Sequence, residues 1–226
     1  MPSTFVTPRP RERIKSMTRS AISGIIKRYW SYIPKTVYLG RRPSTVFIAL
    51  TRKCNANCVF CAYQFATSDQ RAHMPRDLFD RLVAEIERNG ITEVMLSPNI
   101  GEPTIAPDFL GKIERLRSAG VRRIVMTTNA LHFYKIGVDE LLADGPDVIN
   151  ISFAGFDKAM YERDFRVKHY ERTRDNILAL LRANRKLARP RIVNFQLRGD
   201  AAIEDMLAKP EMAEVRELAD SVSVMT

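Results

Sequence analysis

All three cysteines of this chain lie in one short segment, Cys54-Asn-Ala-Asn-Cys58-Val-Phe-Cys61. Their spacing is C-x3-C-x2-C, and the segment follows an apolar run that is typical of a β-strand. Thiolates are iron ligands, and three of them on one loop can hold three irons of a cubane 4Fe–4S cluster. The fourth iron then has no cysteine ligand, and an open iron is a place for chemistry.

Other interpretations of the cysteine triplet stay open. A disulfide framework is disfavoured, because the number of cysteines is odd and the spacing is too tight for separate bridges. A structural zinc site needs a fourth ligand, which His73 could supply. An electron-transfer or redox-sensing cluster without further chemistry would normally use four cysteines. Thiolate ligation of any metal implies a reducing compartment.

Two further polar motifs follow predicted strands. Gly101-Glu102-Pro103 comes after the second strand. Thr-Thr-Asn129-Ala comes after the third strand. Together with the cysteine motif, and with the aromatic Phe60 directly before its last cysteine, these segments resemble the radical S-adenosylmethionine (radical SAM) enzymes. The resemblance covers about residues 44–226.

The resemblance implies both cluster ligands and contacts to the cofactor S-adenosylmethionine (SAM). The cluster ligands would be Cys54, Cys58 and Cys61. The SAM contacts would be Phe60, Gly101, Glu102, Pro103, Asn129, Ser152 and Arg166.

Within this set, individual roles also follow from the resemblance. The Gly-Glu-Pro motif would bind the amino group of the SAM methionine, and Ser152 would lie near the ribose. Arg166 would pair with the SAM carboxylate, with Arg163 as the alternative. Asn129 would either contact the ligand or only cap its turn.

The chain departs from the family pattern in three places. Ile100 stands where a second glycine is common, and Ala130 stands where glycine often follows the asparagine. The acid that often follows the fourth strand is missing, because Ala154 comes there instead.

The chemistry implied by the resemblance is reductive cleavage of SAM to methionine and a 5′-deoxyadenosyl radical, which takes a hydrogen atom from a substrate. The electron would come from an external donor of the flavodoxin or ferredoxin type. Residues 219–226 resemble the sixth strand of members with a C-terminal SPASM or twitch extension. Substrates in that branch are often peptides or proteins, so we expect a peptide or protein, with a sugar or lipid-linked sugar as the alternative. That extension usually carries further cysteines, and none follows Cys61, so the sequence is either a minimal enzyme or a piece of a longer one. We expect a piece of a longer enzyme, because a barrel edge that ends at this strand would leave the strand unpaired.

Strand and helix patterns alternate from residue 44 onward, which predicts an α/β fold with a parallel sheet and helical crossovers. Periodicity does not separate an open doubly wound sheet from a barrel, but the resemblance implies a partial (β/α)6 TIM-like barrel. Chemistry in such a barrel gathers at the carboxyl ends of the strands. The predicted strands are 45–51, 93–97, 123–128, 148–153, 192–197 and 221–225, and the predicted helices are 75–89, 108–119, 138–143, 170–186 and 211–219.

Alternation along the fourth and fifth strands separates an apolar face from a polar one. On the fourth strand, Asn150 and Ser152 are expected inside the barrel. On the fifth strand, Asn194, Gln196 and Arg198 share the polar face. Because unpaired polar burial is costly, these side chains should bond to one another or to water, or line the cavity for adenosine and substrate.

The net charge of +10 belongs to one end of the chain. Residues 1–46 contain ten Lys/Arg and one acid, which leaves 26 Lys/Arg and 25 Asp/Glu for the rest. We therefore expect a basic N-terminal arm over residues 1–43, a nearly neutral core domain over residues 44–226, and no binding of nucleic acid by the core.

Apolar residues recur at helical spacing from Ile14 to Ile33, with Lys and Arg beside the stripe. A helix here could pack on the core domain, or residues 13–33 could contact an anionic membrane or a lipid-linked substrate. No apolar run approaches the roughly 20 residues that span a bilayer. No signal-peptide pattern is present either, so we expect a cytoplasmic protein, with membrane association as the variant.

Overall fold

The computed structural model describes residues 43–96, 100–198 and 203–225. Residues Pro43–Thr226 form one compact unit. The basic arm, and the helix expected within it, lie outside the described residues and stay predictions. In the part of the chain that is described, no helix is long and apolar enough to cross a bilayer.

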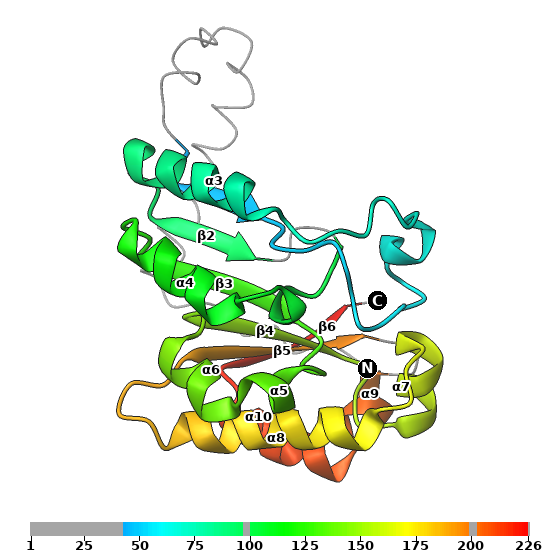
Figure 1. Ribbon diagram of the computed structural model, residues 1–226. Coiled ribbons are helices and arrows are strands. Elements are labelled where there is room, and N and C mark those ends of the chain that lie inside the picture. Colours follow the sequence, from blue (N-terminus) through cyan, green and yellow to red (C-terminus); the bar gives the residue numbers. More distant parts are fainter. Residues whose placement is uncertain (1–42, 97–99, 199–202, 226) are drawn as a thin grey trace, which may run out of the picture. The chain divides into compact units, whose positions relative to one another are not determined.

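One parallel sheet contains all six predicted strands in chain order (Figure 1). Each strand pairs with the next in parallel register. The sheet is not closed, since β1 and β6 do not pair with each other within the described residues. The predicted partial (β/α)6 barrel is confirmed in this open form. Its strands are β1 Thr45–Ile48, β2 Glu93–Leu96, β3 Arg123–Thr128, β4 Val148–Phe153, β5 Ile192–Arg198 and β6 Ser221–Met225.

Helices α3, α4, α6 and α8 lie along one face of the sheet (Figure 1). The strand side chains on that face are fully buried, as Ile149, Ile151 and Phe153 of β4 show. The helices of the fold are η2 Ala62–Phe65, α3 Arg76–Asn89, η3 Pro103–Ile105, α4 Phe109–Ser118, α5 Phe133–Ile136, α6 Val138–Asp144, α7 Lys158–Phe165, α8 Tyr170–Arg185, α9 Ile203–Leu207 and α10 Pro210–Leu218.

β1 is shorter than its apolar pattern predicts. It ends at Ile48, because the chain beyond it leaves β2 and takes a new backbone partner. Arg52 N–H donates to the Ala72 carbonyl at 2.8 Å, and Met74 N–H donates to the Leu50 carbonyl at 3.0 Å. This change of partner directs the segment with the cysteines away from the sheet edge.

The other face of the sheet is polar near the carboxyl ends of the strands. Asn194 donates from Nδ2 to Asn150 Oδ1 at 2.9 Å and accepts from Ser221 Oγ at 2.8 Å. One step further along the strands, Ser152 stands in register with Gln196. The predicted alternation of β4 and β5 is therefore present in the fold, and Asn194 takes the first of its predicted options, bonding to its neighbours.

Candidate functional site

A cavity of about 450 Å³ lies at the carboxyl ends of the strands. Segments that follow β1, β2 and β3 contribute to its walls, together with the last residues of β4 and β5. In Figure 1 the strand arrowheads point toward this side of the sheet, where α7 also lies. The lining residues are Cys54, Cys58, Phe60, Cys61, Ala62, Gly101, Glu102, Thr127, Thr128, Asn129, Ser152, Phe165, Gln196 and Arg198.

All three cysteines are free thiols that line this cavity. Burial, followed by the nearby carboxylate of Glu102, raises the pKa of the Cys54 thiol to about 12. Burial, followed by the charge of Cys54, raises the pKa of the Cys58 thiol to about 12 as well. Three thiols on one cavity are a donor set that fits three irons of a cluster, and the positive charge of bound iron would favour their ionised form.

The arrangement does not suit a single metal ion. Within the described ranges, no three His, Cys, Asp or Glu side chains are placed to share one ion. His73, the candidate fourth zinc ligand, is paired with Thr51 in an isolated antiparallel bridge and does not line the cavity. Cysteines of a cubane each bind a different iron, so separated thiols on one cavity are compatible with a cluster.

The end of α7 holds the loop that carries the cysteines. Asn57 N–H donates to the Phe165 carbonyl at 3.2 Å, and Val59 N–H donates to the Asp164 carbonyl at 2.8 Å. The last carbonyls of a helix have no partner within the helix, so they are free to accept these bonds. The ring of Phe60 also packs edge-on against Phe165, with centroids 5.4 Å apart.

Glu102 is a buried carboxylate with four hydrogen-bond donors. Its Oε1 accepts from the Thr104 backbone N–H at 3.2 Å, from Thr104 Oγ1 at 2.6 Å and from Thr128 Oγ1 at 2.8 Å. Its Oε2 accepts from the Asn129 backbone N–H at 2.9 Å. Burial raises the pKa of Glu102, although these hydrogen bonds act in the opposite direction. The carboxylate is therefore fixed in place at the cavity wall.

Gly101 lets the β2 loop touch the segment that follows β1. Its φ is +103°, and an added Cβ would clash with the Thr51 carbonyl oxygen. Beside it, Glu102 N–H donates to the Lys53 carbonyl at 2.9 Å. Both contacts join the Gly-Glu-Pro motif to the cysteine loop. Pro103 is buried at the start of η3 and does not line the cavity.

Asn129 both caps its own turn and reaches the cysteine loop. Its Oδ1 accepts from the Leu131 backbone N–H at 3.0 Å, and its Nδ2 donates to Asn55 Oδ1 at 2.8 Å. Ala130, which replaces the common glycine, adopts φ +60°. The turn therefore keeps the left-handed conformation that glycine accommodates more readily.

The predicted SAM-carboxylate partners stand apart from this cavity. Arg166 is exposed at the C-cap of α7 and donates to Gln64 Oε1 at 3.5 Å. Arg163 bonds to Asp164 and lines a different hollow, beside Lys209. Ser152, in contrast, lines the cavity together with the cysteines. The fold thus brings together every predicted site residue except Pro103, Arg166 and its alternative Arg163.

Sequence reasoning did not find the threonines that fix Glu102, nor the α7 carbonyls. Thr104 is only two residues from Glu102, but side-chain bonding to the backbone two residues on is typical of Asp and Asn and not of Glu, so this contact has no local signal. Thr128 is distant in sequence from Glu102 and carries no such signal. Gln196 and Arg198 were predicted on the inner face, and both line the cavity.

Similarity to known proteins identifies the family to which this chain belongs. The family model described as "Radical SAM superfamily" matches residues 48–205, which is well over half of the chain. The chain belongs to the radical SAM superfamily. It is therefore a radical SAM enzyme, and its cofactors are a 4Fe–4S cluster and SAM.

Among curated relatives, the chain is similar to two archaeal proteins named probable GTP 3′,8-cyclase. The one from Pyrococcus abyssi is 34% identical over 123 residues, which cover 54% of this chain and 39% of that protein. The one from Thermoplasma volcanium is 29% identical over 177 residues, covering 78% of this chain and 51% of that protein. This radical SAM chain thus spans about half, or less, of the length of these relatives.

Solved structures share the fold at low sequence identity. SuiB of Streptococcus suis, bound to precursor peptide SuiA, aligns with a TM-score of 0.64 at 16% identity, over 97% of this chain and 45% of that chain. The enzyme anSMEcpe with bound AdoMet aligns with a TM-score of 0.59 at 14% identity, over 81% of this chain and 52% of that chain. These likenesses concern the fold of the radical SAM core.

Proposed function

We propose that the cavity at the strand ends is the site where this radical SAM enzyme binds its cluster and SAM. Cys54, Cys58 and Cys61 would hold the cluster. Phe60, Gly101, Glu102, Pro103, Asn129 and Ser152 would bind or position SAM beside it. The single observation that carries this proposal is the convergence of the three thiols and Glu102 on one cavity, from segments far apart in the sequence.

Each residue contributes binding or positioning. The Glu102 carboxylate, held by four donors, presents fixed negative charge to the ammonium group of a methionine. The backbone contacts of Gly101 and Asn57 hold the cysteine loop between the β2 loop and α7. When bound, the reduced cluster supplies the electron that starts radical chemistry from SAM. The burial of Glu102 and Asn129 keeps bulk water from this wall of the site.

The substrate that we propose first is a peptide or protein. This rests on the resemblance of the last strand to the SPASM and twitch branch, and SuiB, which shares the fold, was solved with a precursor peptide. A nucleotide is the second candidate, because the curated relatives are named for a reaction of GTP. A lipid-linked sugar, the flavodoxin- or ferredoxin-type donor and the cytoplasmic location stay predictions from the sequence.

Electron paramagnetic resonance of the reconstituted, dithionite-reduced protein tests the proposal. We expect a cubane signal that changes shape when SAM is added, because an open iron would be available to the cofactor. A cluster signal indifferent to SAM would contradict the proposed SAM site and favour electron transfer.

Replacing each cysteine tests the ligand set separately. Cys54→Ala, Cys58→Ala and Cys61→Ala are each expected to abolish SAM cleavage and to lower the iron and sulfide bound per chain. A variant that keeps full turnover would remove its cysteine from the ligands. His73→Ala is the matched control, and it should retain the cluster because His73 does not line the cavity.

A further inference from the structure

Arg198 brings a positive charge to the wall of the cysteine cavity. It is the last residue of β5, on the same face of the strand as Gln196, and both side chains line the cavity. Ser152 of β4 lines it from the neighbouring strand. None of these three was given a role in holding the cluster.

The Nε atom of Arg198 is buried without a hydrogen-bond partner in the described part of the chain, although the residue as a whole is half-buried. No ion pair to Arg198 is present among the described residues either. Its contact is with the ring of Phe60, whose centroid lies 5.6 Å from the guanidinium carbon.

Arg191, directly before β5, is an arginine whose three guanidinium nitrogens all have hydrogen-bond partners. Its Nε donates to the Leu142 carbonyl at 2.8 Å, and its Nη1 pairs with Asp147 at 3.2 Å. Its Nη2 donates to the Ala143 carbonyl at 2.6 Å. A buried guanidinium nitrogen is costly unless it is paired in this way. The Nε of Arg198 has no such partner among the described residues.

No ion pair joins Arg198 to the carboxylate of this cavity among the described residues. That carboxylate is Glu102, and its oxygens accept from Thr104, Thr128 and Asn129. The remaining lining groups are thiols, neutral polar groups, apolar side chains and Gly101. The cavity wall at Arg198 therefore presents guanidinium donors beside the ring of Phe60, and these donors have no ion-pair partner among the described residues.

We propose that Arg198 binds an anionic group, a carboxylate or a phosphate, of the molecule that fills this cavity. A planar guanidinium matches either group with paired hydrogen bonds, and Phe60 keeps it oriented by cation–π contact. The inference rests on the proposed function of the cavity and adds the charge class of its ligand. The anion has two sources: the carboxylate of SAM or a charged group of the substrate.

The test measures binding by isothermal titration to the full chain, reconstituted with its cluster. Two probe pairs separate the sources. SAM is compared with decarboxylated SAM, which lacks only the carboxylate, and GTP is compared with guanosine, which lacks the phosphates. The proteins are wild type, Arg198→Gln and Arg198→Lys.

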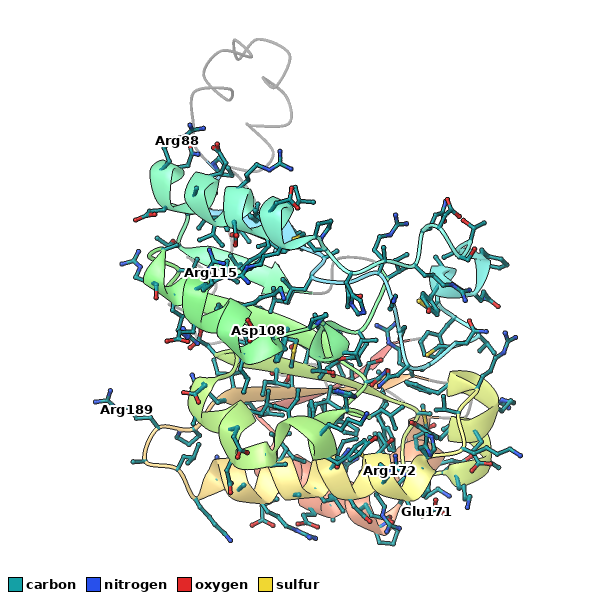
Figure 2. The ribbon with its side chains drawn as sticks, in the orientation of Figure 1. Arg88, Asp108, Arg115, Glu171, Arg172 and Arg189 are labelled. Carbon is teal, nitrogen blue, oxygen red and sulfur yellow. The ribbon has the colours of Figure 1, made fainter. Side chains whose placement is uncertain are left out.

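Arg189→Gln is the matched control, because it removes the same charge from an exposed loop. Figure 2 shows Arg189 at the end of the sheet away from the carboxyl ends of the strands. Bound iron and sulfide, and the thermal midpoint, are measured for each variant. Arg198→Lys keeps the charge if Arg198→Gln does not retain its fold.

Arg198→Gln is expected to weaken the binding of one anionic probe by about tenfold to a hundredfold, which corresponds to the loss of a charge-assisted hydrogen bond. The anion-free partner of that probe should change less than about twofold, and Arg198→Lys should lie in between. The probe pair whose anionic member binds more weakly to the variant identifies the source of the anion, either SAM or the substrate. Arg189→Gln should match wild type for all four probes.

Two results would overturn the proposal on Arg198 alone, while the SAM-dependent change in the cluster signal stays intact. One is equal binding of SAM and of GTP by wild type and both variants. The other is an equal loss for a probe and its anion-free partner, which means that Arg198 only shapes the cavity. A wild type that binds neither SAM nor GTP, and shows no SAM-dependent signal, overturns the proposed function as well.

Discussion

At Gly101 the loop that follows β2 touches the segment that follows β1. The φ of Gly101, +103°, is rarely adopted by residues with a side chain, and its Cα faces the backbone of Thr51 and Arg52. The space for a Cβ is taken by a backbone carbonyl, which no side-chain rotation can move. The contact therefore depends on glycine for two separate reasons, conformation and room.

Gly101→Ala should separate these reasons when compared with Gly120→Ala. Gly120 has φ +93° but no atom within 4 Å of an added Cβ, so its variant carries only the conformational cost. That cost is about 1–3 kcal/mol of unfolding free energy. We expect Gly101→Ala to lose more stability than Gly120→Ala in urea unfolding, and to bind less iron and sulfide. Equal losses in both variants, with cluster content unchanged, would contradict the close packing of the loops.

For single residues, the sequence predicts the cluster ligands better than the residues that hold the site in place by hydrogen bonds. Cys54, Cys58 and Cys61 are recognisable because their spacing is local. The donors that fix Glu102 are harder to find, because Thr128 reaches Glu102 only after the β3 strand has returned beside β2. Arg166 is exposed at the C-cap of α7, directly after the two residues whose carbonyls accept from the cysteine loop.

Helix α7 connects a cap at its first turn with the cysteine loop at its last. The Asp157 side chain accepts from the Met160 backbone N–H at 2.9 Å, and it pairs with Lys209 at 3.3 Å. At the other end, the carbonyls of Asp164 and Phe165 receive the loop amides. A helix of eight residues is marginal by itself, so its cap affects the whole element.

Asp157→Ala should loosen this element from its first turn to the cysteine loop. Losing an N-cap of this kind costs about 1 kcal/mol. We expect faster hydrogen exchange at the amides of Asn57 and Val59, because their acceptors belong to α7. Asp175→Ala, an exposed acid within α8, is the control and should change stability by less than about 0.5 kcal/mol. Unchanged hydrogen exchange at both amides in Asp157→Ala would mean that the cysteine loop is ordered independently of the first turn of α7.

Asp157 also gives a pH dependence with a definite sign. Its hydrogen bond from Met160, and then its contact with Lys209, hold the pKa of this carboxyl below the ordinary value. A lowered folded-state pKa contributes stability above the ordinary aspartate pKa of about 3.9, and the contribution is lost as pH falls through the lowered pKa. The stability difference between wild type and Asp157→Asn should therefore be constant near neutral pH and vanish in acid. A difference that grows in acid would contradict the shift.

The elements were largely predictable because strands and helices alternate, and buried parallel strands are apolar runs. The sequence analysis did not predict α7, whose buried residues include the acid Asp164, so its apolar pattern is broken. The early end of β1 was also missed. Its run of residues stays apolar from Val46 to Leu50, and nothing local shows that the backbone beyond Ile48 pairs with residues 72–74 instead of β2.

Across the whole core, the inner face of the sheet is layered. A register row of apolar side chains crosses five strands: Phe47, Met95, Val125, Val148 and Ile192. The next row toward the carboxyl ends is polar, with Thr127, Asn150, Asn194 and Ser221. Cysteines, Glu102 and Arg198 lie beyond that row. Polar groups therefore increase along the strands, which places the chemistry at their carboxyl ends.

Charge is also segregated over the whole molecule, but along the chain instead of across the sheet. The first 46 residues hold ten Lys/Arg and one acid, whereas the other residues carry 26 Lys/Arg and 25 acids. Attraction of a basic segment to an anionic lipid surface amounts to about 1 kcal/mol for each Lys or Arg near it. Any such attraction in this protein should depend on its first residues.

Co-sedimentation with vesicles tests this dependence. A variant lacking residues 1–36 loses eight Lys/Arg and one acid, together with the apolar stripe from Ile14 to Ile33. We expect the full chain to sediment with phosphatidylserine vesicles in low salt and the shortened chain to stay in solution. Phosphatidylcholine vesicles should bind neither, and salt near 1 M should release the full chain, since the Debye length falls to about 3 Å. Equal sedimentation of the two proteins, with equal thermal midpoints, would contradict membrane contact and favour a segment that packs on the core.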